Sequence, residues 1–215
     1  MGSSQPSATK TNELRMSMCG LLSIEFYRPY FDVDTSQVLS RLAKAGLPVI
    51  KGPSILEEEE GRECVLDLYG PFWVATTLIF VMSAMSNFRL DEDSRDFNLL
   101  VQGFSSVSSY CVVFGGGLWA FFKLKGLPLS VSEALSLCGY SLTSFVPAVA
   151  LCVLPSLFDV LALVAAISMA ILFIQKSTWP RLSEHAPEIR TPIVGAVAVF
   201  QFLCCVFLLG RFAWI

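Results

Sequence analysis

The chain has 215 residues, of which 54% are hydrophobic and only 15% are charged, and its formal net charge is −3. Soluble domains usually carry about 25% charged residues, so this composition excludes a large soluble domain. There is also no basic patch of the kind that binds nucleic acid.

Residues 1 to 69 form the polar part of the chain and are predicted to be a cytosolic segment. Residues 1 to 18 are rich in Ser, Thr, Gln and Asn and have no apolar period, which is typical of disorder. The stretch Phe26 to Phe31 is more aromatic than a linker needs, and aromatic side chains are common at membrane and protein interfaces. We therefore expect this segment to be partly disordered and to contain an interaction surface.

Residues 33 to 48 predict one short amphipathic helix with Asp34 as its N-cap and Gln37 in the capping-box position. Gly46 followed by Pro48 predicts its end. The apolar face comprises Val38, Leu42 and Ala45, while Arg41 and Lys44 are expected to reach lipid headgroups. Two interpretations stay open: a helix packed on the ends of membrane spans, or an interfacial helix that binds a partner.

The remaining chain, residues 70 to 215, contains five apolar segments, each near the roughly 20 residues that cross a bilayer. Lipid demands internal backbone hydrogen bonds, and the segments are too long for barrel strands, so they are predicted to be helices. The spans cover about 70–88, 101–122, 129–151, 156–174 and 192–214. The fold class is therefore an all-α membrane protein.

The orientation follows from the 15 Lys and Arg residues. Twelve of them flank the side that carries residues 1–69 and the loops after the second and fourth spans. Basic residues concentrate on the cytosolic side of membrane proteins. We expect a cytosolic N-terminus and a lumenal C-terminus.

The first span opens with Asp67-Leu68-Tyr69-Gly70-Pro71-Phe72-Trp73. Asp67 stands where a carboxylate favours the positive end of a helix, and Pro71 suits a first helical turn. Gly70 permits a sharp turn, and Tyr69 and Trp73 are placed at headgroup depth. Two roles remain open for this motif: a structural start of the span, or a contact site for a partner.

Two further features concern packing between the spans. Gly115, Gly116 and Gly117 in the second span and Gly139 in the third permit close approach of helix backbones. Gly116 is predicted to contribute to packing or to partner assembly, and the alternative is a flexible glycine stretch that faces lipid. Asp159 starts the fourth span and Arg211 ends the fifth, so the topology places them at matching depth. They are predicted either to form an ion pair or to reach lumenal water separately.

No catalytic, metal or cofactor motif was found, and we expect a protein that is not an enzyme. The single histidine, His185, is predicted to lie in a polar loop, and cysteines inside the spans are interpreted as small hydrophobic residues. A small transporter or channel is the alternative, because ionisable residues inside spans mark pathways. Its candidates are Glu133, Asp159 and Arg211, all near span ends.

Three stretches resemble the Yip domain family of multi-pass membrane proteins: residues 67–73, residues 31–41 and residues 139–147. The third includes Gly139, Tyr140 and Pro147. The resemblance implies residence in the Golgi and early secretory pathway, vesicle-mediated transport with Rab-type GTPases, and assembly with other Yip-type subunits. On this basis the partner-binding residues are expected to be Tyr27, Tyr30, Phe31, Asp32, Asp34, Val38, Arg41 and Leu42.

Overall fold

A computed structural model describes residues 33–48, 55–56, 67–89, 97–152 and 156–213. Within these ranges the chain is helical and contains no strand, which confirms the predicted fold class. Five of the described helical segments are long and apolar enough to cross a membrane. They are Tyr69–Phe88, Asn98–Leu124, Val131–Leu151, Phe158–His185 and Arg190–Gly210.

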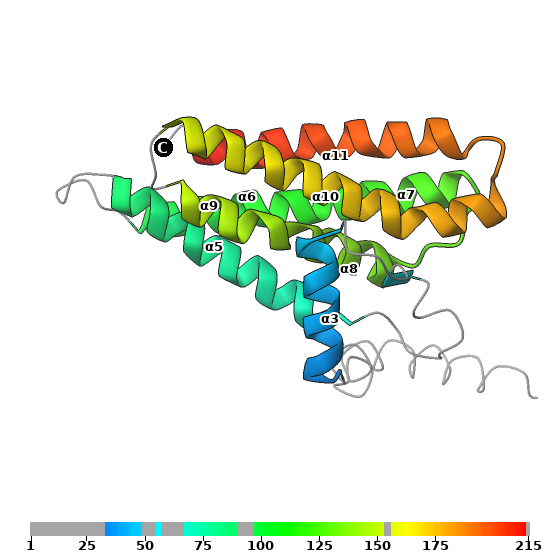
Figure 1. Ribbon diagram of the computed structural model, residues 1–215, viewed down its shortest axis with the longest axis horizontal. Helices are drawn as coiled ribbons and strands as arrows, with labels where there is room; N and C mark the ends of the chain where they lie inside the picture. Colours follow the sequence, from blue (N-terminus) through cyan, green and yellow to red (C-terminus); the bar gives the residue numbers. More distant parts are fainter. Residues whose placement is uncertain (1–32, 49–54, 57–66, 90–96, 153–155, 214–215) are drawn as a thin grey trace, which may run out of the picture.

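The described helices follow one another along the chain in a simple order (Figure 1). They are α3 (Thr35–Gly46), α5 (Tyr69–Arg89), α6 (Asn98–Tyr110), the π-helix η3 (Cys111–Gly115), α7 (Gly116–Leu124), α8 (Val131–Ser141), the 3₁₀-helix η4 (Leu142–Ser144), α9 (Phe145–Leu151), α10 (Ser156–His185) and α11 (Arg190–Ala213). The second span is thus α6, η3 and α7, and the third is α8, η4 and α9.

The third span forms the centre of the bundle. In its most apolar stretch 67% of the residues are buried, against at most 39% in any other span. Helix α5 packs on α8 and α9, α10 packs on α8, α9 and α11, and α11 also lies against α6. The apolar residues of the other spans are mostly left facing outward, as expected for helices surrounded by lipid.

The fourth span continues beyond its predicted end at residue 174, and α10 runs on to His185. The extension stays helical because Thr178 and Leu182 are buried against the bundle, although Pro180 removes one backbone donor inside it. The prediction that His185 lies in a loop was wrong: it lies in the last turn of α10 and is exposed.

The third span is interrupted where one continuous helix was expected. Pro147 has no N–H to offer the carbonyl group of Thr143, four residues earlier, so an α-helical bond cannot form there. The chain tightens into η4 at this point before α9 begins. The hydroxyl of Ser144 donates to the carbonyl oxygen of Ala166 at 3.1 Å and links the interruption to α10.

The short helix before the spans has the predicted limits. It starts after Asp34, which has the extended backbone of an N-cap, and it ends at Gly46. The predicted capping box is wrong, because the side chain of Asp34 makes no capping hydrogen bond. Helix α3 packs against α8, η4 and α10, so its position depends on the third and fourth spans.

Candidate functional site

Asp67 lies at the point where α3, α5 and α8 meet, and none of its surface is exposed. Its carboxylate forms an ion pair with the guanidinium group of Arg41 from α3. The hydroxyl of Tyr140 in α8 donates to the same carboxylate, at 2.8 Å to Oδ2 and 3.0 Å to Oδ1. A buried charge is tolerated only with such partners.

Two further bonds fix the backbone at this position. The N–H of Gly70 donates to Asp67 Oδ2 at 3.0 Å, so the carboxylate also accepts a bond from the first turn of α5. The hydroxyl of Ser136 donates to the Asp67 carbonyl oxygen at 2.5 Å. We call Arg41, Asp67, Gly70, Ser136 and Tyr140 the Asp67 cluster.

Glycine is required at two positions beside the cluster. A Cβ on Gly70 would lie 2.1 Å from the hydroxyl oxygen of Tyr140. A Cβ on Gly139 would lie 2.4 Å from Cβ and 2.9 Å from Cα of Pro71. Both distances are far below van der Waals contact, so α5 and α8 can approach this closely only because these side chains are absent.

The three stretches that carry the family resemblance therefore meet at one place. Asp67, Gly70 and Pro71 come from the first stretch, Arg41 from the second and Tyr140 from the third. From the sequence alone, the three stretches were interpreted separately, and no contact between them was predicted. Ser136 was missed, because a serine inside an apolar helix has no distinctive pattern around it.

The opening motif of the first span divides into two sets. Asp67, Gly70 and Pro71 are buried and hold helices together. Tyr69 and Trp73 are 42% and 51% exposed, with ring centroids 6.2 Å apart, and point away from the core. The first set supports the structural interpretation, and the second set has the exposure expected of side chains at headgroup depth.

Arg41 differs most from its expectation. It was predicted to reach lipid headgroups, but its side chain is only 6% exposed and is paired with Asp67. The reason is that Asp67 needs a cation once it is buried, and α3 supplies the guanidinium group from 26 residues earlier. A partner protein cannot contact this side chain while α3 stays packed on the bundle.

The other expected partner-binding residues lie in different places. Asp34 is exposed, and Val38 and Leu42 are half-buried on the face of α3 that turns to the bundle. Tyr27, Tyr30, Phe31 and Asp32 lie outside the described residues. Leu39, which was not among the expected partner-binding residues, is 66% exposed.

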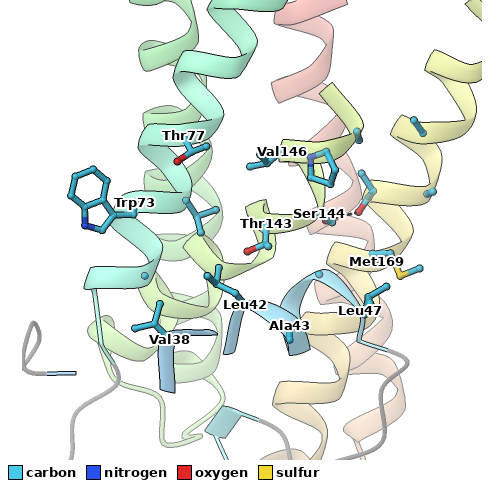
Figure 2. A pocket seen from close by; sticks show the side chains of 18 of the residues that line it. Val38, Leu42, Ala43, Leu47, Trp73, Thr77, Thr143, Ser144, Val146 and Met169 are labelled. Atoms are coloured by element: carbon cyan, nitrogen blue, oxygen red, sulfur yellow. Dashed lines mark hydrogen bonds between the residues drawn. The ribbon is translucent and has the colours of Figure 1, made fainter. Parts of the chain in front are cut away.

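An apolar groove of about 770 Å³ lies next to the Asp67 cluster, and we call it the α3 groove. Its lining comes from α3, α5, η4, α9 and α10. Figure 2 shows Leu42 of α3, Thr77 of α5, Thr143 of η4, Val146 of α9 and Met169 of α10 around this space. The groove was not expected from the sequence, because its lining comes from helices that are far apart along the chain.

A second ion pair lies where α8 begins. Arg181 of α10 donates to Oε1 of Glu133 at 2.6 Å and to the carbonyl oxygen of Pro128 at 3.1 Å. Glu133 also completes a capping box with Ser130. Since Glu133 is engaged in this way, it does not favour the transporter alternative.

Within the described chain, the close helix packing predicted for Gly116 is found instead at Gly115 and Gly117. A Cβ on Gly116 would meet nothing within 4 Å, because this residue faces outward. In contrast, a Cβ on Gly117 would lie 2.7 Å from the ring of Phe200, and one on Gly115 would lie 3.2 Å from Leu135. The π-helix shifts the helix register here, so the central glycine points away from the bundle.

The predicted pair of Asp159 and Arg211 is untested. Helices α10 and α11 pack together, and the start of α10 lies at the same end of the molecule as the end of α11 (Figure 1). The side chain of Arg211 lies outside the described residues. The pairing therefore stays a prediction.

Comparison with curated proteins finds a similar chain in Dictyostelium discoideum, a protein named "Protein YIPF1 homolog". The two are 35% identical over 139 residues, which cover 61% of the present chain and 39% of that relative. This match confirms the resemblance to the Yip family. The chain thus spans less than half the length of its Yip relative. No family model and no solved structure matches the chain.

Proposed function

We propose that this chain is a non-enzymatic Yip-type membrane protein of the Golgi and early secretory pathway. In this proposal it acts in vesicle-mediated transport by binding Rab-type GTPases and other Yip-type subunits, and the α3 end of the bundle faces the cytosol. The name of the relative supports the family context. The excess of basic residues on the α3 side supports the orientation.

The observation that carries the proposal is the fixed position of α3. The Asp67 cluster and the contacts with α8 and α10 hold this helix against the bundle. Its outer side presents Asp34 and the 66% exposed side chain of Leu39. An exposed apolar side chain on a rigid helix is a suitable anchor for a protein partner, since little conformational freedom is lost on binding.

The test is binding of purified full-length protein in lipid nanodiscs to a panel of Rab-type GTPases in their GTP- and GDP-bound forms. Leu39→Asp should reduce binding at least tenfold, because a central apolar anchor is worth at least about 1.4 kcal/mol. The matched control is Leu124→Asp, which changes a side chain that is 85% exposed at the end of α7. Equal binding by wild type and both variants would remove α3 as the recognition surface.

The orientation has its own test. A tag at the N-terminus should be digested by protease added to sealed secretory-pathway vesicles, whereas a tag at the C-terminus should be protected. A protected N-terminal tag would place α3 in the lumen, out of reach of any GTPase, and would end the proposal.

A further inference from the structure

The α3 groove is open to the side of the bundle and closed at one end. Helices α5 and α10 form its walls, η4 and α9 form its floor, and α3 crosses its end. All four of the helices other than α3 belong to spans, so the groove runs along the direction in which lipid chains lie. Its open side continues the outward-facing apolar surface of the first and fourth spans.

The size of the groove decides between two kinds of occupant. A membrane-crossing helix about 10 Å wide and 30 Å long fills roughly 2,000 Å³. The groove offers about 770 Å³, which lies within the range of about 300–1,000 Å³ that small ligands occupy. In addition, α3 would collide with a helix that continued along the groove toward the membrane surface. A single lipid chain fits these limits.

The lining is apolar, with a few hydroxyl groups at the end near α3. Among the lining residues that the structure describes, none is charged. The hydroxyl of Ser144 donates a hydrogen bond to the carbonyl oxygen of Ala166. The hydroxyl oxygen of Thr143 is buried and has no hydrogen-bond partner in the described structure. A donor left without a partner in hydrocarbon is costly, so rotation of the Thr143 side chain, which lines the groove, toward an acceptor on the occupant would be favoured.

The position of Thr143 indicates which lipid group meets it. It lies in η4, where the helix is interrupted, at the α3 end of the groove (Figure 2). Tyr69 and Trp73 also line the groove near this end and are partly exposed. Such aromatic side chains mark the boundary between hydrocarbon and headgroups, which is the depth of the ester carbonyl groups of a glycerophospholipid.

We propose that the α3 groove binds one glycerophospholipid, with an acyl chain along α9 and an ester carbonyl accepting a hydrogen bond from Thr143. The lining supplies a neutral donor and no cation, which suits an ester and leaves the phosphate outside. Bound lipid would then form part of the contact between α3 and the bundle, since Leu42 of α3 and Leu47, the residue that follows α3, line the same groove. This inference does not depend on the proposed trafficking function.

The test uses purified protein reconstituted in phosphatidylcholine vesicles that contain a phosphatidylcholine with a photoactivatable diazirine in its acyl chain. Labelled peptides are mapped by mass spectrometry. Labelling of residues 69–77, 143–151 and 162–169 should saturate at a low fraction of probe. Labelling of the outward face of α5 near Ala84 should instead rise in proportion to the probe, as for ordinary surrounding lipid.

Two variants make the result specific. Ala165→Phe fills the groove and should reduce the saturable labelling at least tenfold, whereas the matched control Ala84→Phe, on the outward face of α5, should leave it unchanged. Thr143→Val keeps the shape and should raise the half-saturating probe fraction about three- to tenfold, the effect of one net hydrogen bond. Melting temperatures within a few degrees of wild type confirm that each variant is folded.

Three outcomes would overturn the inference. The first is labelling of the groove peptides that rises in proportion to the probe and never saturates. The second is unchanged saturable labelling in a folded Ala165→Phe protein. The third is displacement of the probe by a sterol but not by excess unlabelled phosphatidylcholine, which would assign the groove to a different class of lipid.

Discussion

Two arginine–carboxylate pairs of the described chain use the same chemistry in different surroundings. The side chains of Arg41 and Asp67 are 6% and 0% exposed, and their partners come from three separate parts of the sequence. Arg181 and Glu133 are 14% and 18% exposed, and Glu133 is also held by its own helix cap. Because the first pair is buried, its stability depends on each of its partners. The charges of the second pair can also be stabilised by water and by bonds within the helix cap.

The largest effect is expected from Asp67→Asn, which keeps the size of the side chain and removes its charge. Arg41 would then stay buried without a counter-charge, at a cost of about 3–5 kcal/mol in the free energy of unfolding. Unfolding of the purified protein by SDS in mixed micelles measures this loss. A loss below about 1 kcal/mol would mean that Arg41 reaches water and that the pair is not buried in solution.

Tyr140→Phe should have the next largest effect, because it removes one donor from Asp67 and leaves the ion pair in place. Hydrogen bonds to charged groups contribute about 1.5–3 kcal/mol, so we expect a loss in that range in the same SDS assay. Tyr110→Phe is a suitable comparison, since the buried hydroxyl of Tyr110 lies 3.0 Å from the neutral hydroxyl of Ser141. Equal losses in the two variants would show that the charge on Asp67 adds nothing.

The predicted pair of Asp159 and Arg211 extends the comparison to the other end of the bundle. Single charges cost about 2.5–3.5 kcal/mol at the centre of a membrane and less near the ends of spans. Asp159→Arg and Arg211→Asp should each lower expression, and the double variant should recover it. If the double variant expresses no better than the worse single one, the two side chains reach lumenal water separately.

Glu133→Gln tests the more exposed pair. The amide can still accept a bond from the backbone of Ser130, and only the charge that faces Arg181 is lost. We therefore expect a loss of about 1 kcal/mol or less in SDS unfolding, which should shrink further at high salt. A loss as large as that of Asp67→Asn would contradict the distinction between the two pairs.

The smallest effect is expected from Asp34→Ala. Its side chain makes no capping bond and is exposed, so stability should change by less than about 0.5 kcal/mol. This variant also serves binding studies, because it changes the exposed face of α3 without touching the Asp67 cluster. A loss near 1 kcal/mol would show that the capping bond predicted from the sequence does form in the membrane.

The sequence was sufficient for features that depend on local pattern. The five spans, the limits of α3 and the bond from Asp67 to the first turn of α5 follow from hydropathy, capping residues and the position of a carboxylate before a helix. Each of these needs only residues that lie within a few turns of one another, and the physical preferences involved are short-ranged.

The features that were missed depend on tertiary arrangement. Arg41 looked like a surface residue of an amphipathic helix, and nothing nearby indicated that Asp67 would be its partner. Tyr140 lies 73 residues after Asp67, and the pattern of the third span does not define which of its faces meets α5. For Thr143 the one available signal was Pro147, which predicts a carbonyl without its helical donor but not a groove beside it.

The residues of the Asp67 cluster are synthesised at different times, so the cluster cannot form until the last of them has been made. Ribosomes add about 5–20 residues per second, so the 73 residues between Asp67 and Tyr140 take about 4–15 s to make. Arg41 is already present when Asp67 emerges, but the hydroxyl groups of Ser136 and Tyr140 are not. During these seconds the carboxylate at the start of the first span lacks one of its three final partners, and the Asp67 carbonyl oxygen lacks the bond from Ser136. An unfinished chain of this length therefore carries an incompletely paired carboxylate at the start of α5.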